Sequence, residues 1–399
     1  MRRSQRVVMS VFAVMAAVFS LGVMQASGAP TSRPVGSVWS WGSNKWGDLG
    51  DGTTSNQVVP VAVQFQLPAG ARVTSVAAGV AHTLALTSGG GVFGWGDNFQ
   101  GEVGDGSTKV RHVPVPVKLP AGVKVSQIGA GCYDSIALTS KAGVLAWGRN
   151  DFGELGDGTR TDQVLPVPVK LPKGTKATAV SAGCYFSLAL TSTGQVLAWG
   201  RNDSGQLGNG KTANSRRPVL VKFPAGVKIK SIWAGINTGM AITVSGQIYS
   251  WQGLPVKMKF PAASRVGTVT ALASGRDFTL ALTSRGQVFA WGGNSNGQLG
   301  DGNGNASSQP VKVHLPAGAV ATGISATMHT GYAVTTTGQV LAWGSNENGA
   351  LGNGSGTDSD VPVAVSLGSG LSAFAVSAGG ITDGSDGPHA FTIVTQVSG

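Results

Sequence analysis

One phrase recurs along this sequence at a nearly constant spacing, and that recurrence restricts the possible folds more than any other feature. Residues 146–158 read AWGRNDFGELGDG, and residues 198–210 read AWGRNDSGQLGNG. A tryptophan followed by Gly or Gln marks every copy of the phrase: Trp41, Trp95, Trp147, Trp199, Trp251, Trp291 and Trp343. The spacings between them are 54, 52, 52, 52, 40 and 52 residues. Internal repeats of this length indicate units that stack on one another and share a core.

Each unit contains four short segments with the features of β-strands. In one unit these segments are 166–170, 178–183, 187–192 and 195–200. The last two form a hairpin about Thr193-Gly194. A Leu-Pro-x-Gly turn joins the first two, and Pro second with Gly fourth is typical of a type I turn. Four short antiparallel strands in each of seven units are typical of a β-propeller.

The two ends of the repeat region complement each other. A lone WSWG strand (39–42) begins the region, and HAFTIVT (389–395) ends it without a tryptophan strand of its own. Paired as one hairpin, the two would close the ring and leave no open sheet edge. We therefore predict one all-β domain over residues 37–397, a seven-bladed β-propeller without helices, closed by pairing of its N- and C-terminal strands.

Residues 1–28 differ from the rest of the chain. Three arginines precede an apolar run over 7–23, and the small residues at 26–28 supply a cleavage site. This pattern predicts a secretory signal peptide, followed by a short linker over 29–36. The run is almost long enough for a membrane anchor, but the cleavage site favours removal. We expect a secreted or periplasmic protein that has no membrane association after cleavage.

The basic residues show no concentration along the chain. The formal net charge is +11, and without the three arginines of the leader it is about +8, from 26 Lys and Arg against 18 acids. Apart from the pair Arg216-Arg217, these residues are scattered, mostly one or two per repeat. A nucleic-acid groove needs clustered basic residues with stacking aromatics. We predict no nucleic-acid partner, and we expect a monomer.

The repeated phrases resemble the regulator of chromosome condensation (RCC1) repeat. That family's pattern is close to A-A-G-x-x-H-S-L-A-L-T, followed by a strand and a W-G-x-N-x-x-G-Q-L-G-x-G loop. Residues 199–210 match the loop at Trp199, Gly200, Asn202, Gly205, Gln206, Leu207, Gly208 and Gly210, and residues 291–302 match it at the equivalent positions. The resemblance covers about residues 35–397 and six of the seven units. It implies an RCC1-type propeller with seven blades.

The family implies two very different functions. Its nuclear member exchanges nucleotide on the GTPase Ran and docks on chromatin, whereas a similar secreted bacterial protein blocks β-lactamase with a ring of aromatic loops. The leader of the present chain favours the secreted bacterial branch. The steady 52-residue spacing of the middle repeats also leaves no room for the wedge that the exchange factor inserts into its GTPase. Guanine-nucleotide exchange is therefore the less favoured alternative.

Most of the repeated phrase has a structural role. The seven tryptophans are predicted to pack between blades. Loop glycines are predicted to supply positive φ angles. The Asp of the Leu-Gly-Asp-Gly phrase, which exchanges with Asn in two units, is predicted to cap a turn rather than to bind calcium. These aspartates are Asp51, Asp105, Asp157 and Asp301, and the two asparagines are Asn209 and Asn353.

The variable positions near the tryptophan loops carry aromatic residues. Because successive strands run in opposite directions, the Trp-Gly-x-Asn loops and the Ala-Gly-x-x-x turns must share one face of the disc. The aromatic residues on that face are Trp46, Phe99 and Phe152 in the loops and Tyr133, Tyr185, Phe186 and Phe278 in the turns. Aromatics among Gly, Ser and Asn are typical of rigid binding loops. We predict that they bind an unidentified protein; the alternative is that the rings pack locally.

No motif for catalysis is present. The five histidines lack the spacing of zinc ligands, and the two at the repeat's own His position, His82 and His389, are predicted to be structural. No nucleophile elbow or phosphate-binding loop appears. We predict no catalytic residues, no metal and no cofactor. Carbohydrate binding on an aromatic platform is the alternative function.

The two cysteines, Cys132 and Cys184, occupy the same repeat position in neighbouring units. Two cysteines in an exported chain favour a disulfide. Equivalent atoms of adjacent blades approach bonding distance only near the axis, where the Cα separation would be about 6–7 Å. A bridge and two buried thiols both remain open from the sequence.

Overall fold

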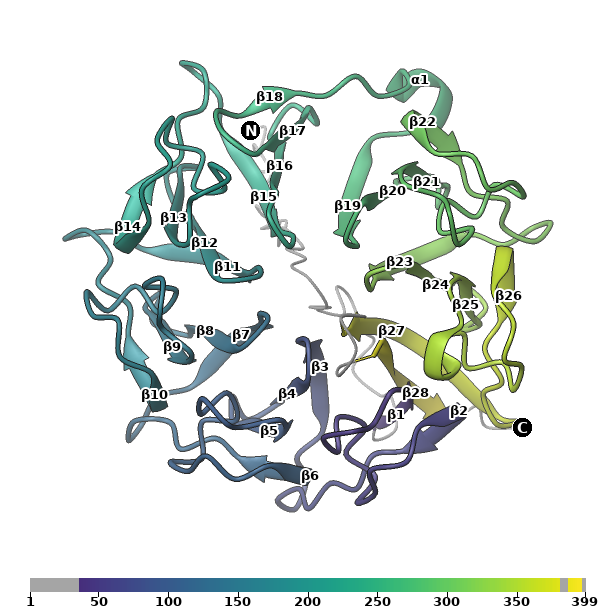
Figure 1. Cartoon of the computed structure of the whole chain (residues 1–399), viewed down its shortest axis with the longest axis horizontal. Helices are drawn as coiled ribbons and strands as arrows, with labels where there is room; N and C mark the ends of the chain where they lie inside the picture. The colour runs from purple at the N-terminus through teal and green to yellow at the C-terminus, as the bar shows by residue number, and fades with distance from the viewer. Residues whose placement is uncertain (1–35, 381–386, 397–399) are drawn as a thin grey trace, which may run out of the picture.

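The computed structural model describes residues 36–380 and 387–396, which form a ring of seven four-stranded antiparallel sheets around a central axis (Figure 1). The predicted signal peptide (1–28) and all of the predicted linker except Gly36 lie outside these residues. The predicted seven-bladed propeller is confirmed. Among the described residues, no helix is long and apolar enough to cross a membrane.

The strands of each blade run in order from the axis to the rim. The innermost strands are β3 (Val73–Ala78), β7 (Val125–Ala130), β11 (Ala177–Ala182), β15 (Ile229–Ala234), β19 (Val269–Ser274), β23 (Ala321–Ala326) and β27 (Leu371–Gly379). The second strands are β4 (His82–Thr87), β8 (Asp134–Thr139), β12 (Phe186–Thr191), β16 (Gly239–Thr243), β20 (Phe278–Thr283), β24 (Thr330–Thr335) and β28 (His389–Gln396). The third strands are β1 (Ser37–Gly42), β5 (Val92–Gly96), β9 (Val144–Gly148), β13 (Val196–Gly200), β17 (Ile248–Trp251), β21 (Val288–Gly292) and β25 (Val340–Gly344). The outer strands are β2 (Gln57–Ala62), β6 (Arg111–Pro116), β10 (Gln163–Pro168), β14 (Ser215–Leu220), β18 (Val256–Lys257), β22 (Ser307–Lys312) and β26 (Ser359–Ala364).

The ring closes through the two ends of the described chain, as predicted. One blade has the strand order β2-β1-β28-β27, so it combines the first strands of the sequence with the last. Strand β1 pairs antiparallel with β28, and Ser40 lies opposite Phe391. Figure 1 shows this blade as purple strands beside yellow ones. The pairing leaves no gap in the circle of blades, which removes an edge that could otherwise pair with another chain.

The repeated tryptophans join neighbouring blades. All seven are buried, and the indole Nε1 of six donates a hydrogen bond to a loop carbonyl of the preceding blade. Trp147 Nε1, for example, lies 2.7 Å from the carbonyl oxygen of Glu102. Trp291 is the exception among the described residues. The loop that would supply its carbonyl is missing from the blade before it, where residues 251–257 run directly into β18.

The recurring asparagine of the phrase, and the Asp or Asn near its end, organise the long loop. Asn150 Oδ1 accepts the backbone N–H of Leu155 at 3.1 Å, and its Nδ2 donates to Asp157 at 3.2 Å. Asp157 in turn accepts the backbone N–H of Thr159 at 2.8 Å. Asn209 accepts the N–H of Lys211 in the same way at 3.0 Å. The predicted turn-capping role of these positions is confirmed, and it explains why Asp and Asn exchange.

Two details of the prediction were wrong. The chain has a short helix α1 (Ala263–Val266) and a 3₁₀ turn η1 (Glu347–Gly349). Helix α1 forms where Leu-Pro-x-Gly becomes Phe-Pro-Ala-Ala, because no glycine ends the turn before Gly267. The second detail concerns the Leu-Pro-x-Gly turns, where Pro is the first and Gly the third residue of the four-residue turn, instead of the second and the fourth. Ala71 N donates to Pro68 O at 3.0 Å, and Gly70 has φ +75°, which only glycine adopts readily.

Candidate protein-binding face

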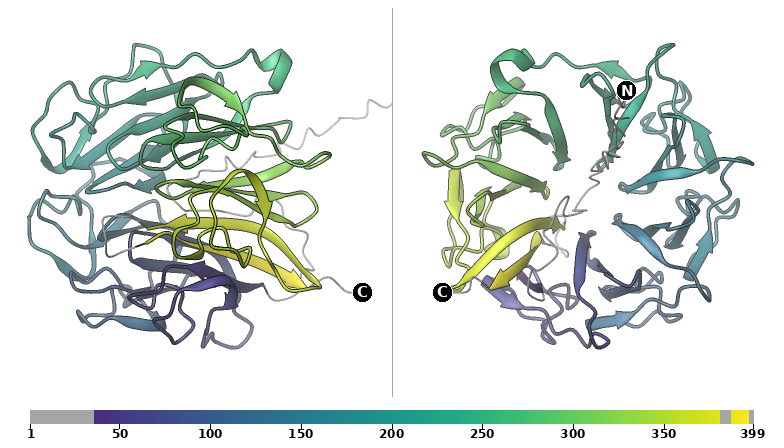
Figure 2. Two further views of the ribbon diagram at one scale, coloured as in Figure 1. Left: turned by 45° about the vertical axis from the view of Figure 1, so that its right-hand side comes forward. Right: turned by 180° about the vertical axis from the view of Figure 1, so that it is seen from behind.

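The long tryptophan loops and the Ala-Gly-x-x-x turns share one face of the disc, which we call the loop face. Contacts between the two sets of side chains confirm the predicted arrangement. The ring of Tyr185, from a turn, lies 5.5 Å from the ring of Phe152, from a loop. The Leu-Pro-x-Gly turns and the hairpins between second and third strands lie on the opposite face, which we call the turn face. Figure 2 shows the disc obliquely and from behind.

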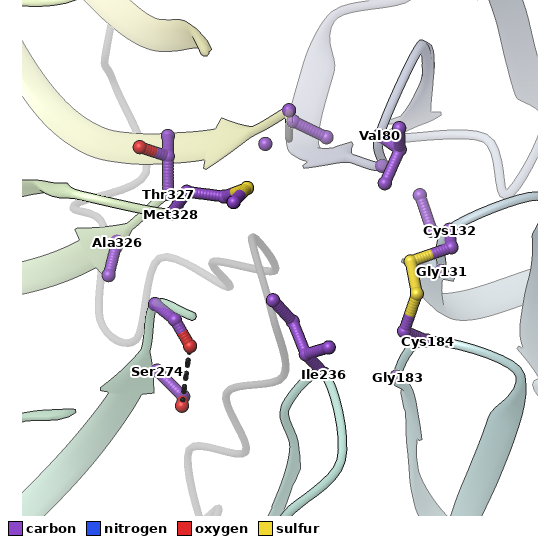
Figure 3. Close-up of a pocket in the computed structure, with 16 residues that line it drawn as sticks. Val80, Gly131, Cys132, Gly183, Cys184, Ile236, Ser274, Ala326, Thr327 and Met328 are labelled. Carbon is purple, nitrogen blue, oxygen red and sulfur yellow. Dashed lines mark hydrogen bonds between the residues drawn. A yellow bond between two sulfur atoms is a disulfide. The ribbon is translucent and has the colours of Figure 1, made fainter. Parts of the chain in front are cut away.

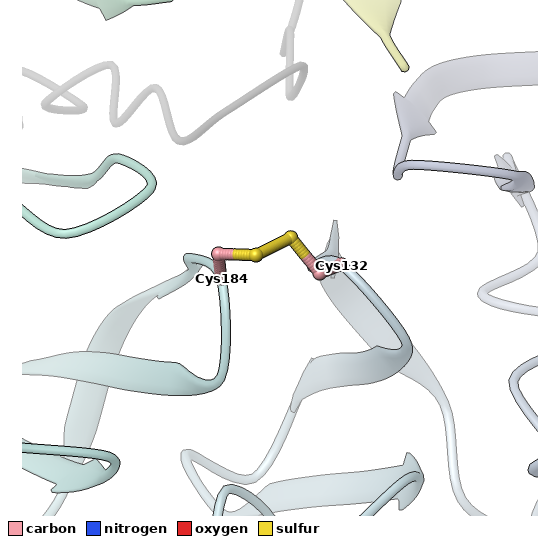
Figure 4. Close-up of a disulfide and its surroundings, with 2 residues drawn as sticks. All are labelled: Cys132 and Cys184. Carbon is pink, nitrogen blue, oxygen red and sulfur yellow. A yellow bond between two sulfur atoms is a disulfide. The ribbon is translucent and has the colours of Figure 1, made fainter. Parts of the chain in front are cut away.

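A disulfide links two neighbouring blades where their inner strands end. Cys132 follows β7 and Cys184 follows β11, and their sulfur atoms are bonded (Figure 4). Of the two alternatives left open by the sequence, the structure contains the bridge. The Cα atoms are 4.7 Å apart, closer than the 6–7 Å expected, because the ends of the inner strands converge toward the axis.

Five of the predicted aromatic residues lie on one sector of the loop face, as a pair of rings and a group of three above a shared apolar cluster, and we call them the aromatic arc: Trp46, Phe99, Tyr133, Phe152 and Tyr185. Trp46 meets Phe99 edge to face at 5.2 Å, and Tyr133 stacks on Tyr185 at 6.0 Å. Phe99 is 53% exposed, and the other four are partly exposed. Packing beneath the arc includes both half-cystines and Val80, which connect it to the axis. The rings therefore pack on one another and still present area to solvent.

Two arginines lie over these rings, a feature that the sequence prediction missed. The Arg149 guanidinium lies 5.1 Å from the centre of the Tyr185 ring, and that of Arg201 lies 5.5 Å from the Phe152 ring. Asp151 accepts a bond from Arg149 at 2.7 Å, and Asp203 accepts one from Arg201 at 2.6 Å. The Arg-Asn-Asp sequence that occurs in both loops was the available signal. Cation–π contacts of this kind fix the orientation of the arginines.

Two predicted binding residues do not belong to the arc. Phe186 and Phe278 are 0% and 2% exposed and pack in the hydrophobic core. Each is the first residue of a second strand, the position that His82 and His389 occupy in other blades. This position points between blades, so neither ring can contact a partner. Aligning the repeats at the His position would have given the correct assignment.

The two histidines at that position are buried and neutral, as their predicted structural role requires. Burial lowers the pKa of His82 to about 3, with a smaller contribution from His389. Burial likewise lowers the pKa of His389 to about 4. His82 Nε2 lies 3.0 Å from the hydroxyl of Ser135 in the next blade. Both imidazoles therefore stay uncharged at neutral pH, and His82 contributes a contact between blades.

Three buried acids lie under the loop face. Glu102 accepts the backbone N–H of Gln100 at 3.0 Å, and Glu154 accepts that of Phe152 at 2.7 Å. Burial raises the pKa of Glu102 to about 8 and that of Glu154 to about 7. Burial, followed by the charges of Glu154 and Glu102, raises the pKa of Asp134 well above its usual range. None of the three is more than 1% exposed, so none can reach a substrate, and the two glutamates hold loop backbone.

The axis opens on the loop face as a small apolar pocket (Figure 3). Val80, the disulfide, Ile236 and Met328 line it, together with glycines of the turns. Its volume is about 40 Å³, which is room for a few water molecules. Across residues 36–380 and 387–396, no group of three or more His, Cys, Asp or Glu side chains could hold a metal ion. The arc, rather than this pocket, offers the larger contact surface.

Comparisons with known proteins identify the repeat. Residues 31–254 match the family model described as the RCC1-like domain. Residues 269–298, 285–330 and 337–380 match models of the regulator of chromosome condensation (RCC1) repeat. The chain belongs to the RCC1 repeat family. The predicted resemblance is therefore confirmed at the level of the family.

Two relatives and one solved structure show what this chain is similar to. The ultraviolet-B receptor UVR8 of Arabidopsis thaliana is 30% identical over 339 residues, which cover 82% of this chain and 76% of the receptor. The human E3 ubiquitin-protein ligase HERC2 is 39% identical over 210 residues, which cover 52% of this chain but only 4% of the ligase. Prp20p of Saccharomyces cerevisiae has a similar structure, with a TM-score of 0.79 and 23% identity, over 92% of this chain and 93% of the yeast chain. That likeness concerns the fold.

Proposed function

We propose that this RCC1-family propeller is an exported, non-catalytic protein-binding module whose contact surface is the aromatic arc. The observation that carries the proposal is the joint presence, on one sector of the loop face, of five partly exposed aromatic rings and two arginines held over them. Aromatic and arginine side chains supply most of the binding energy at protein interfaces.

The arc is held rigidly, which favours binding. Glu154 fixes the backbone at Phe152, and Glu102 fixes it at Gln100, directly after Phe99. The disulfide lies beneath Tyr133 and Tyr185, at the residues that precede them. The loops would therefore lose little conformational entropy when a partner binds, because they are already ordered in the free protein.

Two features support export. Residues 1–28 have the pattern of a secretory signal peptide, and the disulfide is a bond that persists in oxidising compartments. We accordingly propose a secreted or periplasmic protein of the secreted bacterial branch of the family. The arc is the feature that such a binder would share with the aromatic loops of that branch.

The test compares three forms of residues 29–399 immobilised on a solid support. These are the wild type, the variant W46A/F99A/F152A, and a control variant L165A/L220A/V256A that removes exposed apolar side chains from outer strands. We expect the wild type and the control to retain the same protein from the producing cells or their medium, and the arc variant to lose it. Equal retention by the arc variant would contradict the proposal. Binding to a glycan array instead of a protein would favour the carbohydrate-binding alternative.

A further inference from the structure

The turn face carries an array of basic side chains that the sequence does not reveal. The residue directly before the inner strand is Arg72, Lys124, Lys176 or Lys228 in four consecutive blades, those of β3, β7, β11 and β15. All four are exposed. Residues that are scattered along the chain thus become neighbours around the axis, because equivalent positions of adjacent blades lie side by side.

Local contacts place these four positions at the surface of the turn face. The carbonyl of Lys124 accepts the N–H of Ser140, and that of Lys228 accepts the N–H of Val244, so each lies beside the hairpin of its own blade. Lys228 Nζ reaches across to the preceding blade and donates to the carbonyl of Thr193 at 3.1 Å. Lys141, on a hairpin, and Lys173, in a Leu-Pro-x-Gly turn, are exposed on the same face.

In the part of the chain that the structure describes, no acidic side chain accompanies these basic residues on the turn face. Across the described residues, the turns and hairpins of the turn face contain no Asp or Glu. The described acids lie in the tryptophan loops, in the Ala-Gly-x-x-x turns or at the strand ends beside them, where many of them cap backbone N–H groups. The described acids are therefore confined to the side of the loop face, and the positive potential of the turn face adds up over several blades.

The array of basic side chains extends into the next blade, and two exposed valines lie on the same face. Arg285 Nη1 donates to the carbonyl of Arg265 at 2.8 Å, which joins the hairpin of that blade to helix α1. Val244, on the hairpin beside Lys228, is 70% exposed. Val320, which occupies the position of Lys228 two blades further on, is 40% exposed.

We propose that the turn face docks on an anionic lipid bilayer. Basic side chains at the same height on one face of a disc match a planar negative surface. Each Lys or Arg near such a surface raises the partitioning of the protein onto it about fivefold. A nucleic acid would need a linear groove with stacking aromatics, and the exposed apolar residues here are valines. Docking in this way would leave the loop face and the aromatic arc directed away from the membrane.

The expectation that the chain has no membrane association was based on the distribution of basic residues along the sequence and on cleavage of the leader. The array identified here is created by the fold, because its members are 52 residues apart in the chain. It requires no spanning segment. It is also separate from the aromatic arc, so the two proposals can fail independently.

The experiment measures sedimentation of residues 29–399 with vesicles of phosphatidylcholine, with or without phosphatidylglycerol. The variant is R72Q/K124Q/K176Q/K228Q. The control K109Q/R160Q/K211Q/R216Q removes the same charge from exposed positions in the tryptophan loops and in β14. We expect wild type and control to bind the anionic vesicles in a salt-sensitive manner, and the variant to bind about 100-fold or more weakly.

Several results would overturn the proposal. Equal binding to neutral vesicles, or equal loss in the control and the variant, would show that the turn face does not recognise anionic lipid. Binding to duplex DNA or to an acidic polysaccharide without binding to vesicles would assign the array to another polyanion. Thermal unfolding of each form checks that the substitutions leave the fold intact. The arc variant W46A/F99A/F152A should still bind the vesicles.

Discussion

Glu102, Glu154, Gln206 and Gln298 perform one task in four different loops. Each side-chain oxygen accepts the backbone N–H of the residue two positions earlier, at 3.0, 2.7, 2.9 and 2.8 Å. An amide does this without a charge, whereas a buried carboxyl must stay protonated or become a buried charge. The raised pKa values of the two glutamates express that cost.

The two glutamates should make the stability of the fold depend on pH. Because their folded-state pKa values of about 8 and 7 lie above the ordinary glutamate value of about 4.5, the unfolded chain loses these protons first. The free energy of unfolding should therefore fall as the pH rises from about 5 to about 9. The variant E102Q/E154Q should keep the hydrogen bonds, as Gln206 does, and show a flatter profile.

Urea unfolding across that pH range measures this effect. The variant should exceed the wild type by on the order of a few kcal/mol at the alkaline end, because each pKa unit corresponds to about 1.4 kcal/mol. At pH 5 the two should agree closely. Parallel profiles for the two proteins would mean that the carboxyls are not the source of the pH dependence.

At the scale of the element, the unit that repeats is a contact between blades. A tryptophan at the end of a third strand fills the space against the preceding blade, and its N–H satisfies a loop carbonyl there. The tryptophan's role could be predicted because it recurs at one register. The carbonyl that it meets could not, because backbone groups have no sequence signature.

The blade of Trp291 provides a comparison for the energy of that contact. Substituting Phe for Trp147 removes ring volume and one of two donors to the buried Glu102 carbonyl, which keeps the Ser135 hydroxyl, whereas the same change at Trp291 removes ring volume and no such bond. We expect W147F to destabilise the fold by about 1–2 kcal/mol more than W291F. Chemical denaturation of both variants measures the difference. Equal losses would show that the hydrogen bond adds nothing to the packing.

At the scale of the whole molecule, the spacing and order of the repeats were sufficient to predict the number of blades, the closure and which connections share a face. It did not show which strand is innermost, because parity is the same in either direction. It also misplaced Phe186 and Phe278, because a ring at the end of a strand can point outward or between blades. The basic array was missed because its members meet only when blades stack.

The disulfide ties two blades together at the axis, so its loss should loosen the whole ring. The bridge closes a loop between residues 132 and 184, and a closed loop of this size stabilises the folded state by about 2–4 kcal/mol. The variant C132A/C184A should unfold at a lower temperature than the oxidised wild type, and reduction of the wild type should have a similar effect. Intact mass after alkylation of protein purified without reductant reports the bond directly. Two alkylated thiols would contradict it.

The most direct test of the account places a photoreactive benzoylphenylalanine at Phe99, the most exposed ring of the aromatic arc, and in a second protein at Thr193 on the turn face. Both forms are irradiated in the producing cells, and the products are identified by mass spectrometry. If the aromatic arc is the binding surface, one protein partner should be cross-linked through position 99 and none through position 193. A protein cross-linked through position 193 with none through position 99 would contradict it.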